Sequence, residues 1–150
     1  MTTKTLTGST TQAPTMEQQR PHAKRVHDAW SPGDVAHQGD LIIVALGALP
    51  KSAKPRTNRQ LAEGDSRGSR HELVGGECYD ADPKELAGLI ASATGGKVKV
   101  DPKYVGACFS GAAVIDHPQH AAQEFPDQPC SVVVFQRNLD AEEREQRQQD

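Results

Sequence analysis

The sequence predicts a mainly β fold, in the form of a small β-barrel or β-clip-like domain with one inserted helix and an extended N-terminal arm. Short apolar runs rich in β-branched residues recur through residues 38–139, and Gly- and Pro-containing turns separate them. One segment, about residues 83–94, has the apolar period of a helix. Large apolar side chains are scarce in residues 1–37, and a chain of 150 residues suits a single domain.

Residues 1–37 are predicted to form the polar arm. Their start, Thr2–Gln12, is a low-complexity run rich in Thr and Ser, without periodicity. Such a run cannot bury enough apolar surface to offset the entropy lost on ordering. Trp30 is the only tryptophan, and two interpretations of it stay open. It is either an anchor where the arm meets another surface or a cap on the domain's own core.

The domain is predicted to begin with a turn at Gln38-Gly39-Asp40. Leu41–Leu46 follows as a continuous apolar run, which is typical of a strand covered on both faces. Pro50 ends this strand, and the basic residues 51–59 are predicted to form a loop. Further strands are expected at 60–63, 70–74, 97–100, 104–109, 112–116 and 131–136, with turns at Gly75-Gly76 and Ser110-Gly111.

The helix has start and stop signals. Asp82 is a suitable N-cap, Pro83 suits the first helical position, and Glu85 completes a pattern like a capping box. Gly95-Gly96 supplies the stop. One apolar stripe, expected to pack on the sheet, is formed by Leu86, Leu89, Ile90 and Ala93. Residues 140–150 are a polar C-terminal tail, expected as a short solvated helix or a frayed end.

The cysteines and the apolar runs limit the setting of the protein. Cys78, Cys108 and Cys130 are odd in number and share no CxxC spacing, so neither a disulfide framework nor a cysteine-only zinc site is expected. A reducing compartment, such as a bacterial cytoplasm, is the default. The N-terminus lacks the apolar run of a signal peptide, and Leu41–Leu49 is too short to span a bilayer.

Charge is segregated along the chain. A net charge of −3 argues against a general nucleic-acid binder. Residues 51–70 nevertheless carry six basic residues against Glu63 and Asp65, and residues 138–150 carry five acids against two arginines. These segments are either two solvated surfaces or complementary faces for head-to-tail docking between copies. Besides Trp30, the candidate interaction residues are Lys51, Lys54, Arg56 and Arg59.

Three histidines form the constellation best suited to chemistry. His71 and the pair His117 and His120 each lie at the edge of a predicted strand, so their imidazoles converge if those strands are neighbours. Three neutral imidazoles suffice to hold zinc or another divalent ion and leave a position for a water activated for hydrolysis. Asp116 or Glu72 could accept a hydrogen bond from one of these imidazoles and so fix its tautomer without binding the metal itself. Alternatively, the histidines are surface or turn residues bonded to backbone.

Several islands of the sequence, in this order, resemble a family of small, uncharacterised bacterial and phage-borne β proteins. The islands are Gln38-Gly39-Asp40 and its strand, Leu61-Ala62-Glu63-Gly64 with His71, His117 with His120, and residues 131–137 with the closing Asp150. The family pattern contains "QGD", "LAEGE-TGHAH", "HEEH" and "QREY". The resemblance covers about two thirds of the chain and supports the fold and the site. It implies no reaction.

This chain departs from the family pattern at several positions. Ser69 stands where the pattern has a histidine, and Pro118-Gln119 replaces two glutamates. Asn138-Leu139 replaces the aromatic residue after Gln-Arg. The arm and the helix look like additions. A four-histidine site, if the family has one, is reduced here to three histidines.

Three classes of function stay open. The first is a non-enzymatic structural protein, such as a phage virion accessory or capsid-decoration protein, that docks through its N-terminal arm on a capsid or on copies of itself. Its location would be the virion or the bacterial cytoplasm, without a membrane or direct nucleic-acid binding. The second is a zinc-type metal-binding domain, extending to a metal-dependent enzyme, that uses His71, His117 and His120. A third is a regulatory, antitoxin-like partner using the basic loop 51–59.

Overall fold

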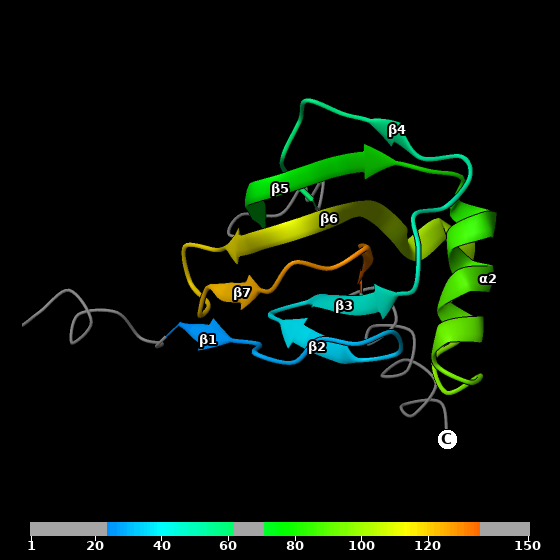
Figure 1. Cartoon of the computed structure of the whole chain (residues 1–150), viewed down its shortest axis with the longest axis horizontal. Coiled ribbons are helices and arrows are strands. Elements are labelled where there is room, and N and C mark those ends of the chain that lie inside the picture. Colours follow the sequence, from blue (N-terminus) through cyan, green and yellow to red (C-terminus); the bar gives the residue numbers. More distant parts are fainter. Residues whose placement is uncertain (1–23, 62–70, 136–150) are drawn as a thin grey trace, which may run out of the picture.

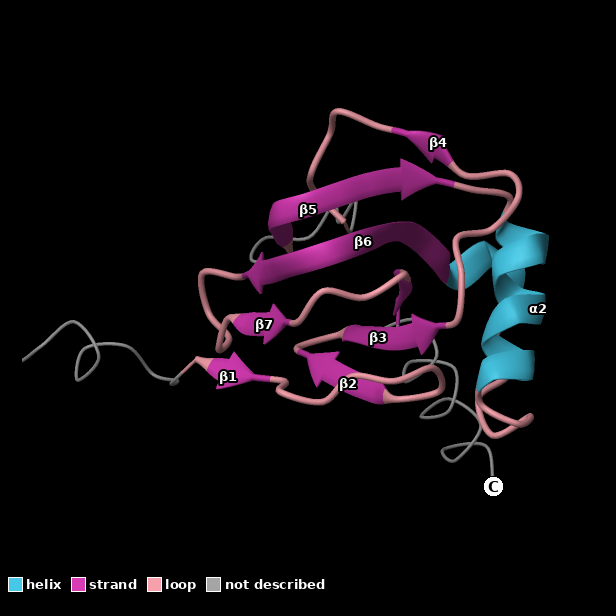
Figure 2. Cartoon of the chain, in the orientation of Figure 1, coloured by secondary structure: helices cyan, strands magenta, loops and turns pink. Residues whose placement is uncertain are grey.

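A computed structural model describes residues 24–61 and 71–135, and the structural statements below concern these residues. They form a mainly β domain in which one sheet curls into a half-barrel and a single α-helix stands at one end (Figures 1 and 2). The fold class predicted from the sequence is confirmed. The elements are β1 (Arg25–Val26), β2 (Val35–Gln38), β3 (Leu41–Leu46), β4 (Lys54–Pro55), β5 (Glu72–Asp80), α2 (Pro83–Ala93), a 3₁₀ turn (Pro102–Tyr104), β6 (Val105–Asp116), β7 (Gln123–Phe125) and β8 (Cys130–Phe135).

The long strand β6 organises the sheet. The strand order is β1-β7-β6-β8-β3-β2, and β5 pairs with β6 and with the short β4. Curling brings β2 back towards β6 and β7, and side chains rather than a backbone ladder bridge this seam. Gln38 Nε2 donates to the carbonyl oxygens of Ile115 and Ala121 at 2.9 and 2.8 Å. Gln123 Nε2 donates to the carbonyl oxygen of His37.

The two faces of the sheet carry separate cores. One cluster includes Leu41, Phe109 and Phe125, with Trp30 packed against it. The opposite cluster, which includes Val44 and Val132, packs against Leu86 and Ile90 of α2. Val44, Leu46 and Ile43 therefore divide between two buried faces, as the continuous apolar run of β3 predicted.

The predicted boundary between arm and domain at residue 37 is wrong. β1 and β2 belong to the sheet, because β1 pairs with β7 in parallel and β2 pairs with β3. Trp30 caps the domain's own core, since its indole Nε1 donates to the Ser131 hydroxyl at 2.8 Å and its ring lies against Phe125. Residues 1–23 of the predicted arm and the tail 140–150 lie outside the described residues.

Two predicted turns are bulges inside strands. Residues 104–109 and 112–116 were expected as separate strands, but β6 runs through Ser110-Gly111 without a break. β5 likewise continues through Gly75-Gly76, where its register against β6 shifts. Gly76 and Gly111 have positive φ values of 62° and 84°. Glycine adopts such values without a steric penalty, and β-bulges often contain a residue in this conformation. These bulges therefore bend the paired strands β5 and β6 and do not end them.

Other predicted strands are shorter or missing. At 60–63, only Gln60 is described in a β-bridge, with Glu72, because residues 62–70 are outside the described part. Residues 97–100 form no strand. Val98 and Val100 instead pack against the cluster that contains Val44, Val132 and the α2 residues. The alternating apolar residues of this segment are therefore buried without pairing to another strand.

The helix is confirmed at Pro83–Ala93, with Asp82 as its N-cap. The role predicted for Glu85 is wrong. Its carboxylate accepts hydrogen bonds from the Lys51 and Ser52 amides and from the Ser52 hydroxyl, at 2.7, 3.1 and 2.6 Å. Glu85 therefore ties the loop after β3 to the first turn of α2. These bonds, with the Ser52 hydroxyl first, lower the pKa of Glu85 below its ordinary 4.5.

Glu85→Gln is expected to lower the melting temperature at pH 7. A carboxyl whose pKa is lower in the folded chain stabilises the fold above its unfolded-state pKa. That stabilisation is lost as the pH falls through the folded-state pKa, so the difference between the two proteins should shrink and then vanish as the pH is lowered from 7 past that pKa. Thermal unfolding of both proteins across this range, with Glu72→Gln as an exposed-acid control, checks the expectation. A difference that persists at low pH would contradict it.

Candidate functional site

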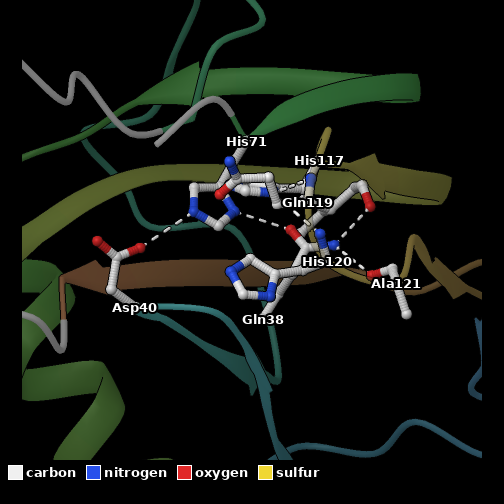
Figure 3. A network of polar contacts seen from close by, with 8 residues as sticks. Gln38, Asp40, His71, His117, Gln119, His120 and Ala121 are labelled. Carbon is white, nitrogen blue, oxygen red and sulfur yellow. Dashed lines mark hydrogen bonds and ion pairs between the residues drawn. The ribbon is translucent and has the colours of Figure 1, made fainter. Parts of the chain in front are cut away.

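The three histidines converge, as the sequence predicted. His71 immediately precedes β5 and His117 immediately follows β6, and Glu72 pairs with Asp116 in the ladder between them. The rings of His71 and His117 have centroids 4.5 Å apart, and those of His117 and His120 are also 4.5 Å apart. β5 starts and β6 ends on the side of the sheet away from α2 (Figure 1), and Figure 3 shows the histidine cluster formed at these strand ends.

Gln38 fixes the tautomer of His71. Both polar atoms of its buried amide are in use, because Nε2 donates to the two backbone carbonyls of the seam and Oε1 lies 2.8 Å from His71 Nδ1. A carbonyl oxygen only accepts, so the amide cannot be flipped and Nδ1 must carry a proton. In neutral His71 the lone pair is therefore on Nε2.

Asp40 faces that lone pair. Its Oδ1 lies 3.2 Å from His71 Nε2, in the turn between β2 and β3 (Figure 3). The His71 ring is fully buried, whereas 30 % of the Asp40 side chain is exposed, so the pair lies at the rim of the core. Burial lowers the pKa of His71 below its ordinary 6.5, and the hydrogen bond that the protonated ring would donate from Nε2 to Asp40 opposes this shift.

His117 is a structural histidine. Its Nδ1 accepts the backbone N–H groups of Gln119 and His120, at 2.9 and 3.2 Å, and so closes the loop between β6 and β7. An accepting Nδ1 holds the lone pair, so the proton of the neutral ring is on Nε2. His117 consequently offers no lone pair to a metal.

The predicted shell of three histidine ligands is therefore not formed. The rings are close, but the lone pair of His117 is used by backbone amides. Within residues 24–61 and 71–135, no group of three His, Cys, Asp or Glu is placed to hold a metal ion together. The role predicted for Asp116 or Glu72, to fix the tautomer of a histidine ligand, is not observed either. Asp116 Oδ1 accepts from the backbone N–H of His117, and Glu72 is exposed.

Gln38 and Asp40 are not among the site residues predicted from the sequence. They flank Gly39, whose φ of 59° makes the tight turn. A Cβ on Gly39 would lie 2.7 Å from Nε2 of the His120 ring, so the third imidazole rests directly on this turn. The available signal is the Gln38-Gly39-Asp40 motif, which predicts a turn and belongs to the family resemblance but does not by itself assign a role to its two polar side chains.

The basic residues proposed for docking are largely used within the fold. Arg59 donates to the carbonyls of Gly75 and Gly76 at 2.8 and 3.0 Å, and Arg56 pairs with Asp80 at 3.0 Å. Backbone bonds of residues 56–61 complete a cover over the edge of β5. Lys51 and Lys54 are exposed, and no ion pair with them is found among the described residues.

The cysteines are buried free thiols, which fits their expected role as small apolar side chains. Burial raises the pKa of Cys78, and the neighbouring Cys130 thiol together with burial raises that of Cys108. Thiols in such surroundings are poor nucleophiles.

Comparison with protein-family models, with curated proteins and with solved structures found no match. The class that the fold and the site define is a mainly β half-barrel with a histidine, glutamine and aspartate network at one end. No described helix is long and apolar enough to cross a membrane.

Proposed function

We propose that this protein is a non-enzymatic assembly protein that docks through residues 1–23 and the adjoining strand β1. Its partner is a larger protein assembly or further copies of the chain. The resemblance to phage-borne proteins favours a virion, in which the chain would be an accessory or decoration protein.

The supporting observation is the open edge of β1. This strand pairs with β7 alone among the described residues. The amides of Arg25 and His27 donate to the carbonyls of Ala122 and Glu124, so Val26, between them, directs its own N–H and C=O to the other side. Val26 is also 51 % exposed. An edge with free ladder positions and an apolar side chain is a template for an added strand.

Side-chain contacts hold this edge in place against β7, which favours binding. Lys24 pairs with Glu124 at 2.6 Å, and the His27 ring bonds to Gln123 at 2.8 Å. The same ring stacks on Phe125 at a centroid distance of 4.8 Å. A strand that is already ordered loses less entropy when a partner pairs with it. Residues 1–23 join the domain at this edge and can extend the contact.

The polar groups of the histidine cluster also suit a structural role. His71 bonds to Gln38, which bridges the seam, and His117 accepts backbone amides of the loop between β6 and β7. The buried thiols are not activated. We assign no catalytic residue.

Mass photometry of the full chain, beside a chain that starts at Lys24, tests the proposal. Val26→Pro removes the outward N–H without touching the β1–β7 ladder, and Val26→Thr keeps that N–H as the matched control. The full chain and Val26→Thr are expected to assemble, whereas the shortened chain and Val26→Pro stay monomeric. Full chain that remains monomeric, alone and with virion proteins, would contradict the proposal.

A further inference from the structure

We propose that β1 of one copy pairs with β1 of a second copy, in antiparallel register about Val26, to form a symmetric dimer. This inference rests on the proposed function, and it specifies the partner, the direction and the register of the docking. The pairing would join two half-barrels through one continuous sheet, to which each copy contributes the same edge.

The backbone of Val26 fits a contact between two identical edges. Its N–H and C=O point away from β7, because the amides of Arg25 and His27 on either side donate to the carbonyls of Ala122 and Glu124. In an antiparallel ladder, two opposed residues of this kind exchange both N–H···O bonds, with their Cα atoms about 5.5 Å apart. A twofold axis at Val26 therefore satisfies both groups in both copies.

The charges beside Val26 suit the antiparallel direction. Lys24 lies on the same face as Val26, since its ammonium contacts Glu124, the register partner of Val26. Antiparallel pairing about Val26 places Lys24 of each copy opposite Asp28 of the other. Asp28 is exposed, and no ion pair with it is found among residues 24–61 and 71–135. The Lys24 ammonium has several donors, so it can bind Glu124 and the second copy's Asp28 together.

A parallel pairing of the two edges is disfavoured by the same charges. It would set Lys24 against Lys24 and Asp28 against Asp28, and like charges directly opposite each other destabilise a sheet. The antiparallel register instead gives each dimer two equivalent pairs of opposite charge, because a symmetric contact uses every interaction twice.

Cysteine cross-linking of the full chain tests the register. The three native cysteines are buried, so a cysteine introduced at position 26 supplies the exposed thiol. Val26→Cys is expected to give a disulfide-linked dimer with oxidised glutathione as the oxidant, because Cα atoms about 5.5 Å apart suit a disulfide. The full chain is used because residues 1–23 belong to the proposed docking segment and two short strands alone make a small contact.

Val74→Cys is the matched control for exposure. Val74 is 53 % exposed and Val26 is 51 % exposed, but Val74 lies on β5, three strands away from β1. It is therefore about 14 Å from the proposed axis and should not cross-link. A Val26→Cys protein that stays monomeric, or that cross-links no faster than Val74→Cys, would overturn the proposal.

Lys24→Cys tests the direction of the pairing. Antiparallel pairing about Val26 separates the two copies of residue 24 by about 14 Å, which is too far for a disulfide, whereas parallel pairing brings them together. Lys24→Cys is therefore expected to stay uncross-linked. A disulfide between the two copies at this position would overturn the antiparallel register.

Asp28→Lys tests the charge pairing. It turns both pairs of opposite charge into pairs of like charge, so the dimer should dissociate at about fivefold or more higher concentration in sedimentation velocity. Glu72→Lys makes the same change of charge on β5 and should leave the dissociation constant unchanged. Equal dissociation constants for the parent and Asp28→Lys would contradict the proposed register.

The cross-linking result separates this inference from the proposed function. If the Val26 amide is protected on assembly but Val26→Cys does not cross-link, another strand occupies the edge. Docking through β1 would then stand, and the symmetric dimer would be wrong. If neither protection nor cross-linking occurs, both proposals are overturned.

Discussion

Gln38→Leu is expected to lower the free energy of unfolding by about 3–6 kcal/mol, the largest effect of any single change at the seam. The substitution keeps the volume but removes the bonds of Gln38 to three partners: the buried His71 Nδ1–H and Ile115 carbonyl, and the half-buried Ala121 carbonyl. Each buried polar group left unpaired costs about 1–3 kcal/mol. Urea unfolding at constant pH measures the difference.

Gln123→Leu is the matched control for this prediction. Gln123 bridges the same seam, but its bonds go to the His37 carbonyl and to the half-buried His27 ring. Its loss should cost less than that of Gln38. A Gln38→Leu protein within about 1 kcal/mol of the parent would show that the seam is held by apolar packing instead.

Phe125→Ala is expected to cost about 3–5 kcal/mol and to release β1. The Phe125 ring is buried and contacts Trp30, His27 and Phe109, with centroids 4.9, 4.8 and 5.6 Å away. Removing it opens a cavity beneath the segment that carries the proposed docking edge. Denaturant unfolding gives the stability loss. Amide exchange of Arg25 and His27, whose N–H groups bond to β7, reports the release of β1.

Phe125→Leu separates the cavity from the aromatic contacts. Leucine keeps most of the volume and should cost less than about 1.5 kcal/mol while β1 stays bound. Equal losses for the two variants would mean that ring stacking, and not filled volume, holds the segment. Slow exchange at Arg25 and His27 in Phe125→Ala would contradict the link between this ring and β1.

The elements with strong local signals could be predicted from the sequence. β3 and β8 are continuous apolar runs buried on both faces, and α2 carries a cap, a proline and an apolar stripe. β1, β2 and β7 have two to four residues each and depend on partners distant in sequence. β1, for example, is ordered by residues 122–124, which no local pattern reveals.

The convergence of the histidines could be predicted because both sequence groups lie at strand ends that turn out to be paired. Their chemical roles could not. Those roles depend on which ring nitrogen carries a proton, and the partners that decide it are Gln38 for His71 and two loop amides for His117. Glu85 illustrates the same limit, since a capping pattern does not reveal a bond to a distant loop.

The most direct test of the assembly function is amide exchange at Val26 by NMR, at low and high concentrations of the full chain. The Val26 N–H lies on the outer edge of β1, so only an added strand can protect it by a ladder bond. We predict that its exchange slows as the full chain assembles and stays fast in a chain that starts at Lys24. Exchange that is equally fast in both proteins at every concentration and in the presence of virion proteins would contradict docking at this edge.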